Sequence, residues 1–260
     1  MKPREKQGLV FYQSKKLLKV SVDNYFFNRR GGYSRGAFES LNLSYRVGDD
    51  PEVVERNYSK VERVLGIKHL ATVHQVHGKV VLDLDSYKLE ESRLRKIEAD
   101  AIITMQKGVA IAVLVADCFP LILADPGKNI LAIAHCGRRP IILGVIENAI
   151  SEIIARGGTA GDVIAAIGPG VGPECYTVDE KIIAEFADRF PKGAGKIWRR
   201  KAGQYHLDLK AAMVSILEAS GVKRSNIDDL GVCTSCNDEF FSHRRSAGKT
   251  GRQIAVAMLE

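Results

Sequence analysis

Residues 108–139, GVAIAVLVADCFPLILADPGKNILAIAHCGRR, decide the fold of this chain. They contain three short apolar runs, at 109–116, 120–124 and 130–134, that are rich in Val, Ile and Leu. Runs of this length with turn residues between them are typical of buried β-strands, and residues 125–129 (DPGKN) supply the turn before the third run. Because polar residues do not alternate with the apolar ones, we expect both faces of these strands to be covered.

Helices are expected on both sides of this stretch. Asp50 and Pro51 are typical of a helix start, and apolar residues at helical spacing up to Gly66 predict a helix over 51–65. Pro140 is expected to open a second helix, with isoleucines along one face, that ends before Gly157. Residues 71–84 read as two strands interrupted at Gly78, whereas the basic, Gly-containing residues 191–205 read as a loop.

Strands outnumber helices in this reading and often follow one another directly. The sequence shows no internal repeat, no low-complexity tract and no long linker. We therefore predict an α+β fold over residues 1–260, a single domain in which mixed β-sheets are flanked by helices as a layered α/β sandwich.

Composition excludes several classes of protein. The net charge of +7 favours anionic partners such as phosphate but is too small to indicate nucleic acid, and the single tryptophan, Trp198, offers little for base stacking. No apolar run approaches the roughly 20 residues that span a bilayer, so no membrane partner is expected. The N-terminal residues lack the apolar centre of a signal peptide, and five cysteines make an odd number for disulfide pairing, so we expect a reducing, cytoplasmic location.

A candidate metal site lies at the ends of the central strands. Cys118 and His135 stand where the apolar runs break or end, and His77 precedes Gly78 in the segment 71–84. In an extended strand His74 and His77 would point to opposite faces, so only one of them is expected to join the site. Two imidazoles and one thiolate suit zinc with an open fourth position, or copper. From spacing alone, a core cysteine with two hydrogen-bonded histidines remains the alternative.

Cys233 and Cys236 form a single C-x-x-C pair. A structural zinc site needs a second pair of ligands, and only Cys175 or a histidine is left to supply it. We interpret the pair as a packed turn.

Many short motifs, taken in order, resemble one known family. The matching pieces run nearly end to end: Arg29-Arg30-Gly31-Gly32, Ser40-Leu41-Asn42-Leu43, Gly48-Asp49-Asp50-Pro51, Gln75-Val76-His77-Gly78, Ala99-Asp100-Ala101, Ala116-Asp117-Cys118-Phe119-Pro120, Ala134-His135, Gly168-Pro169, Cys175-Tyr176, Cys233-Thr234, Phe241-Ser242, Arg244-Arg245 and Gly251-Arg252. The chain is similar to the bacterial laccase-domain or polyphenol-oxidase-like proteins, now described as zinc-containing purine nucleoside phosphorylases with adenosine deaminase activity.

The resemblance implies a catalytic zinc on His77, Cys118 and His135, the set that the residues themselves favour. It also implies purine nucleosides (adenosine, inosine, guanosine or methylthioadenosine) and phosphate as substrates. Arg29, Arg139 and Arg245 are then expected to clamp an anion, since a guanidinium matches phosphate with paired donors, and Asn42 is expected to contact substrate. The sequence does not specify an oligomeric state.

The chain departs from the family pattern at several positions. Around the third ligand the family pattern AHAGWRG is replaced by AHCGRRP, which introduces Cys136, Arg138 and Pro140. Thr177 replaces a glutamate and His243 a tyrosine. The metal-ligand set is intact, and the changes bear on substrate preference and rate.

Two other enzyme classes compete with this interpretation. A copper-dependent polyphenol oxidase could use the same three ligands, but a multicopper relay needs several histidine-rich centres and the chain has six histidines. A metal-free cysteine hydrolase would use Cys118 activated by His135. Metal analysis separates these classes.

Overall fold

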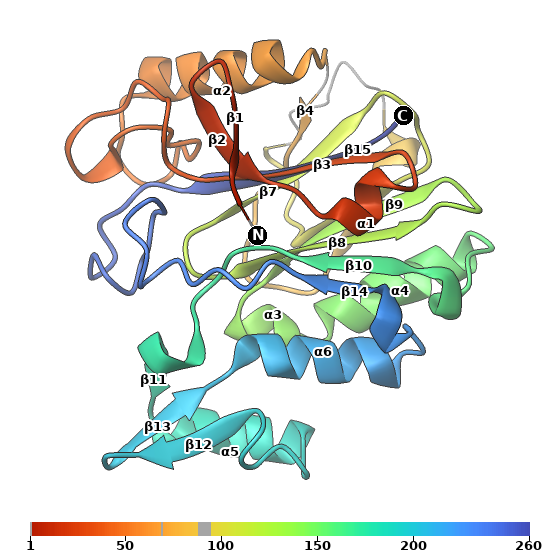
Figure 1. Cartoon of the computed structure of the whole chain (residues 1–260), viewed down its shortest axis with the longest axis vertical. Helices are drawn as coiled ribbons and strands as arrows, with labels where there is room; N and C mark the ends of the chain where they lie inside the picture. Colours follow the sequence, from red (N-terminus) through yellow and green to blue (C-terminus); the bar gives the residue numbers. More distant parts are fainter. Residues whose placement is uncertain (1, 69, 88–94) are drawn as a thin grey trace.

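The computed structural model describes residues 2–68, 70–87 and 95–260. Figure 1 shows two β-sheets lying face to face, with helix α2 over the outer face of one sheet and helices α3, α4 and α6 over the outer face of the other. A small third sheet and helix α5 lie beyond the second helical layer. This arrangement confirms the predicted α+β sandwich of mixed sheets flanked by helices.

The second sheet carries most of the quoted stretch. Its strand order is β14-β10-β8-β9-β6-β5, and β8 and β9 pair antiparallel as a hairpin across the predicted turn. The strands are β5 (Val81–Asp83), β6 (Ala101–Thr104), β8 (Phe119–Asp125), β9 (Ile130–Cys136), β10 (Ile164–Ile167) and β14 (Ile227–Asp229).

The first sheet has the order β1-β2-β3-β15-β7-β4, with the C-terminal strand β15 at its centre between β3 and β7. Its strands are β1 (Arg4–Lys6), β2 (Leu9–Tyr12), β3 (Val22–Phe27), β4 (Leu70–Ala71), β7 (Ala110–Val115) and β15 (Gln253–Leu259). The first apolar run of the quoted stretch therefore belongs to a different sheet from the other two. The link between them, at Asp117 and Cys118, crosses from one sheet to the other.

The helices and the small sheet complete the layers. The helices are α1 (Lys15–Leu18), α2 (Pro51–Leu65), α3 (Arg138–Leu143), α4 (Val145–Ala155), α5 (Glu180–Arg189) and α6 (Leu209–Ala219). The small sheet contains β11 (Thr177–Val178), β12 (Trp198–Lys201) and β13 (Gln204–Leu207). Among the described residues, no helix combines the length and the apolar character that crossing a membrane requires.

Side-chain alternation along the strands separates three hydrophobic cores. On β7, Ala110 and Ala112 face helix α2, whereas Ile111 and Val113 face the second sheet. A third core lies between the second sheet and helices α3, α4 and α6. Because every strand of the sandwich interior is covered on both faces, the apolar runs lack the clean alternation of a half-exposed strand.

Helix α2 confirms the prediction from its capping residues. The Asp50 carboxylate accepts a hydrogen bond from the Glu52 N–H at 2.9 Å, Pro51 is the first helical residue, and Gly66 ends the helix with a left-handed φ of 71°. The buried residues of the helix are Val54, Asn57, Tyr58, Val61 and Val64.

Two local predictions were wrong, and a third was right in the order of its elements but not in their length. The helix expected from Pro140 is two helices, because Gly144, at φ 95°, breaks it between α3 and α4. The residues 191–205 contain strand β12 and the start of β13, joined at Ala202 and Gly203, which both have positive φ as a tight hairpin requires. Residues 71–84 do contain a strand, a break that includes Gly78 and a second strand, as predicted, but β4 and β5 are short and residues 72–80 between them form a longer loop than expected.

Candidate metal centre and cavity

Three side chains meet where the two sheets approach each other. The ligand atoms of His77, Cys118 and His135 all lie within 4.8 Å of one another. Cys118 lies on the crossover between β7 and β8, His135 lies near the end of β9, and His77 lies in the loop before β5. Strand pairing places Pro120 opposite His135, so the β8–β9 hairpin brings the thiol and the imidazole together.

His77 reaches this group through a loop rather than a strand. Its backbone has a left-handed φ of 56°, a region that few residues other than glycine adopt. The loop is held in this conformation by Asp100, a fully buried carboxylate that accepts hydrogen bonds from the N–H groups of Val76, His77 and Gly78 at 3.2, 3.1 and 2.6 Å.

Asp100 also orients His135. Its Oδ1 lies 2.8 Å from Nδ1 of His135, so the Nε2 atom of that ring is the one left to face a ligand. Carboxylates in this position fix the tautomer and orientation of metal-binding histidines. Burial raises the pKa of Asp100, but the hydrogen bonds from His135 and from the backbone N–H groups outweigh it, and the pKa is lowered overall.

The thiol and the imidazole form a charged pair when no cation lies between them. Burial raises the pKa of Cys118, but the charge and hydrogen bonds of His135 and His77 bring it down to about 6. Burial lowers the pKa of His135, and the Cys118 thiolate together with Asp100 raises it to about 9. The site thus favours a thiolate, the form that binds metals.

The backbone leaves space for this group at Gly137. A Cβ atom at this position would lie 2.7 Å from Sγ of Cys118 and 3.5 Å from the His77 ring. Two imidazoles, one thiolate, a carboxylate behind one imidazole and an uncrowded backbone fit a metal ion.

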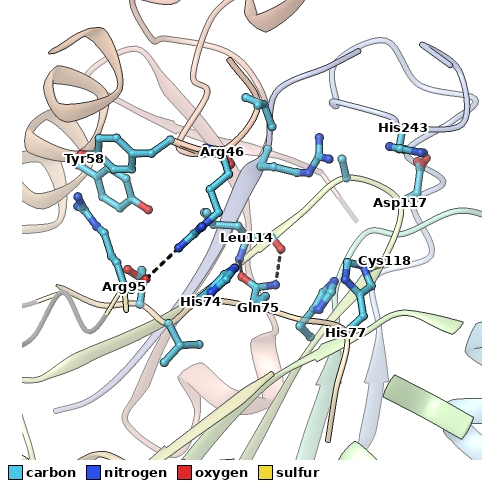
Figure 2. Close-up of a pocket in the computed structure, with 18 of the residues that line it drawn as sticks. Arg46, Tyr58, His74, Gln75, His77, Arg95, Leu114, Asp117, Cys118 and His243 are labelled. Carbon is cyan, nitrogen blue, oxygen red and sulfur yellow. Dashed lines mark hydrogen bonds between the residues drawn. The ribbon is translucent and has the colours of Figure 1, made fainter. Parts of the chain in front are cut away.

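The three residues line one end of a cavity of about 710 Å³. Figure 2 shows His77 and Cys118 near Asp117 and His243 at this end, with Tyr58 and Arg95 at the other. A cavity of this size suits a small-molecule ligand. Its described lining residues are Ser44, Tyr45, Arg46, Val47, Tyr58, Thr72, Val73, His74, Gln75, His77, Arg95, Leu114, Ala116, Asp117, Cys118, His135, Tyr176, His243, Arg244 and Arg252.

The cavity wall combines aromatic rings with cations. At the metal end the Arg244 guanidinium lies 4.9 Å from the centre of the Tyr176 ring. At the far end Tyr45 and Tyr58 stack at 5.7 Å, and the Arg95 guanidinium lies over both rings. Flat rings and guanidinium groups suit a ligand that has both an aromatic base and an anionic part.

Comparison with known proteins places the chain in a family. A family model described as multi-copper polyphenol oxidoreductase laccase matches residues 23–260. The chain belongs to this family. A family member named purine nucleoside phosphorylase, from Deinococcus radiodurans, is 34% identical over 241 residues, which cover 91% of this chain and 89% of that protein. Purine nucleoside phosphorylase YlmD from Geobacillus stearothermophilus is 35% identical over 236 residues, covering 87% and 86%.

Solved structures of family proteins share the fold. The crystal structure of YlmD from Geobacillus stearothermophilus superimposes with a TM-score of 0.90 at 30% identity, and covers 99% of this chain and 98% of its own. The crystal structure of the Bacillus licheniformis hypothetical protein YfiH also gives 0.90, at 29% identity, with 99% of each chain covered.

The four residues predicted to bind substrate lie outside the cavity lining. The Arg29 guanidinium donates to the backbone oxygen of Glu39 and lies over the Phe241 ring. Asn42 is fully buried and holds the backbone of Ser44 and Arg252.

The other two are arginines. Arg139 is exposed on α3, and Arg245 donates to backbone oxygens of the segment 234–240. In this structure the four side chains contact backbone groups, an aromatic ring or solvent, and their role in substrate binding stays a prediction.

The cations that do line the described cavity are Arg46, Arg95, Arg244 and Arg252. Arg244 and Arg252 belong to the family motifs, but the sequence alone indicated no role for either side chain. Their place in the family motifs could have indicated a role in the site. Nothing local distinguished Arg244 from its neighbour Arg245, because only the turn geometry decides which side chain faces the cavity.

The structure shows where the residues that differ from the family pattern lie. Cys136 is buried in the core beneath α3, and Arg138 pairs with Glu185 at 3.1 Å, outside the cavity lining. Thr177 pairs with His206 in the small sheet. Of the departures, His243 alone lines the cavity, so it is the one that can alter ligand preference directly.

His74 is the alternative to His77 as the first metal ligand. It lines the same cavity as His77, so the strand-alternation reasoning was wrong about where it points, yet it stands outside the three-residue group. We expect His74→Ala to retain the metal of this site with unchanged stoichiometry and His77→Ala to lose it, as measured by elemental analysis of the purified proteins. The opposite pattern would show that the wrong histidine was assigned.

Proposed function

We propose that this protein is a zinc-dependent purine nucleoside phosphorylase that also deaminates adenosine. The observation that carries the proposal is the cavity of about 710 Å³ in which the His77–Cys118–His135 group, aromatic rings and arginines converge. Support comes from family members at 31–35% identity that are named purine nucleoside phosphorylases. The substrates in this proposal are a purine nucleoside and phosphate.

The two imidazoles and the thiolate would hold the metal. Zinc bound there would supply a Lewis acid and lower the pKa of water, which is the chemistry that deamination at C6 of adenine requires. Thiolate and imidazole are donors that suit zinc, and Asp100 keeps His135 in the orientation that such a site needs. Cys118 as a ligand is not available as a free nucleophile, which argues against a metal-free hydrolase.

The cavity residues bind and orient the substrates. In phosphorolysis, phosphate attacks C1′ of the ribose as the purine leaves, so the site must hold an anion close to the sugar. Arg244 and Arg252 line the metal end, and Asp117 fixes Arg244 by accepting its backbone N–H at 2.5 Å. The rings of Tyr45, Tyr58 and Tyr176 offer flat surfaces for the purine.

A direct assay tests the proposal. The zinc-loaded protein is incubated with adenosine or inosine, with and without phosphate, and products are separated by chromatography. We expect free base and ribose 1-phosphate only when phosphate is present, and inosine from adenosine in either case. Release of base at the same rate without phosphate, or no product from any purine nucleoside, would overturn it.

Copper remains the competing metal because the family description names multi-copper oxidases. Among the described residues, the groups that could hold a metal are one His₂Cys set and one set of three cysteines, whereas a multicopper relay requires several histidine-rich centres. We expect zinc in the purified protein and no oxidation of a diphenol after copper loading. Copper at this site with diphenol turnover would favour the oxidase.

The protonation states at the site predict how zinc affinity depends on pH. With the Cys118 pKa lowered to about 6 and that of His135 raised to about 9, the metal-free site between these values holds a thiolate and a protonated imidazole. Binding then releases the His135 proton, so affinity should rise about tenfold per pH unit in this window and level off above it. Competition with a chromophoric chelator measures this slope; an affinity independent of pH would contradict it.

Phosphate binding is expected to depend on Arg244 rather than Arg139. Arg244→Ala keeps the backbone N–H that Asp117 accepts but removes the guanidinium, and a lost charged hydrogen bond of about 1.5 kcal/mol raises the phosphate KM roughly tenfold. Arg139→Ala is the matched control, since Arg139 is exposed outside the cavity lining. Initial rates at varied phosphate measure both. Equal effects, or a larger effect at Arg139, would restore the assignment made from the motif.

A further inference from the structure

A second group of metal-capable side chains lies outside the cavity lining. The sulfur atoms of Cys175, Cys233 and Cys236 lie within 4.8 Å of one another, and those of Cys175 and Cys236 are 2.7 Å apart. Cys175 ends the short 3₁₀ turn Pro173–Cys175, whereas the other two belong to the C-x-x-C loop near the C-terminus. The interpretation of this pair as a packed turn was incomplete, because the fold adds a third thiol from 58 residues earlier in the chain.

Backbone contacts hold the two segments in register. The N–H of Gly170 donates to the Val232 oxygen at 3.2 Å, and the N–H of Thr234 donates back to the Gly170 oxygen at 3.0 Å. A Cβ atom at Gly172 would lie 3.3 Å from both Cβ and Sγ of Cys233. The absence of a side chain at Gly172 therefore lets the two segments pack closely at Cys233. The three thiols are therefore brought together by the fold of two segments and not by a flexible tail.

Arg245 fixes the C-x-x-C loop from its other side. Its Nη1 donates to the backbone oxygens of Thr234, Ser235 and Asn237 at 2.7, 3.2 and 3.1 Å. The Arg245 guanidinium, predicted from the sequence to clamp an anion, thus donates to three backbone oxygens of this loop. The loop conformation is thus set before any ligand binds.

The loop presents N–H groups to one sulfur. The N–H of Gly172 lies 3.1 Å from Sγ of Cys233. This N–H group points at the sulfur that joins the C-x-x-C loop to the segment carrying Cys175, so the position of Cys233 is fixed by the backbone.

We propose that Cys175, Cys233 and Cys236 form a second zinc site, in which three thiolates bind the ion and its fourth position, on the exposed side of Cys236, is taken by water. Each thiol gives its proton to solvent on binding, and neither sulfur nor zinc changes oxidation state. The three thiolates would supply three of the four donors that zinc takes, and the sulfurs of Cys175 and Cys236 would have to separate from 2.7 Å to about 3.8 Å, the spacing of thiolates around one zinc ion. A disulfide would use only two of them and would need an oxidant.

Zinc here would brace the wall of the cavity. Cys175 is followed by Tyr176, which lines the cavity. Cys233 is followed by Thr234, whose hydroxyl donates to Oδ1 of Asp117 at 2.7 Å, next to Cys118. An ion that joins the two segments therefore fixes residues on both sides of the metal end. The expected role is structural.

Cobalt titration of the Cys118→Ala protein isolates this site, because that substitution removes the thiolate of the other one. Under reducing conditions we expect one equivalent of Co²⁺ to produce the near-ultraviolet charge-transfer absorbance of thiolate–cobalt bonds. The additional change Cys233→Ser should abolish most of this absorbance. Cys136→Ala, the matched control, removes a buried cysteine outside both groups and should leave it unchanged.

Alkylation of the unmutated chain provides a measurement that no variant can confound. With zinc added in excess of one equivalent, we expect Cys175, Cys233 and Cys236 to be protected from iodoacetamide at least tenfold relative to the metal-free protein, as mapped by mass spectrometry. Unchanged alkylation of these three while Cys118 is protected would overturn the second site and leave the first intact. A Cys175–Cys236 disulfide with no zinc uptake would also overturn it.

Discussion

Replacing Cys118 with alanine is expected to remove one metal ion per chain and to abolish phosphorolysis. The thiolate is one of three ligands, and no other described cysteine lies near enough to replace it, since the remaining thiol of this region, Cys136, is buried in the core behind α3. Two imidazoles alone bind zinc much more weakly than a set of three protein ligands. Elemental analysis and the phosphate-dependent assay, made on the same preparation, measure both losses.

The control for this experiment is Cys136→Ala. It removes a neighbouring thiol and leaves the ligand set intact, so metal content and rate should stay within about twofold. Metal content should fall by one ion per chain rather than to zero, because the group of Cys175, Cys233 and Cys236 can hold another ion. Unchanged metal content in Cys118→Ala, with or without activity, would reject the ligand assignment.

The second large effect is expected at Asp100. Asp100→Asn keeps the size of the side chain, but one of its two oxygen atoms becomes an NH₂ donor. Each oxygen accepts hydrogen bonds in the native site, from His135 and the His77 N–H on one side and from the Val76 and Gly78 N–H groups on the other. The amide must therefore face a donor on one side.

Zinc affinity should fall about 10- to 100-fold as a result, the range typical for loss of a carboxylate behind a metal-binding histidine. The buried donors left without acceptors should lower the free energy of unfolding by about 1–3 kcal/mol. Chelator competition and denaturant unfolding measure the two quantities separately.

Asp125→Asn is the matched control for this change. Asp125 is also a buried carboxylate, at the end of β8, and it accepts the Thr159 N–H at 3.0 Å far from the metal group. It should lose stability without losing zinc affinity. If Asp100→Asn bound zinc as tightly as the unmutated protein, Asp100 would be a loop anchor with no effect on the metal.

Several elements of the fold and two of the three metal ligands could be predicted from the local sequence. Strands β7, β8 and β9 and helix α2 follow from short-range signals, namely apolar runs, turn residues and caps, which act between neighbours in the chain. The donor types at Cys118 and His135 follow in the same way, because each stands at the end or break of an apolar run. These signals also gave the fold class, since alternating layers are the way to bury strands that are apolar on both faces.

Tertiary structure alone decided which of these pieces meet. The β7–β8 link crosses between two sheets because β7 pairs with the C-terminal strand β15, a contact over more than a hundred residues that no local pattern encodes. That crossing places Cys118 beside His135, and Asp100 bends the His77 loop toward them. Turn geometry likewise sends Arg244 to the cavity and Arg245 to the C-x-x-C loop, and the register of Gly170 with Cys233 brings Cys175 to the other thiols. The sequence specifies the type of side chain at each position, but which side chains become neighbours in the fold depends on long-range strand pairing and packing.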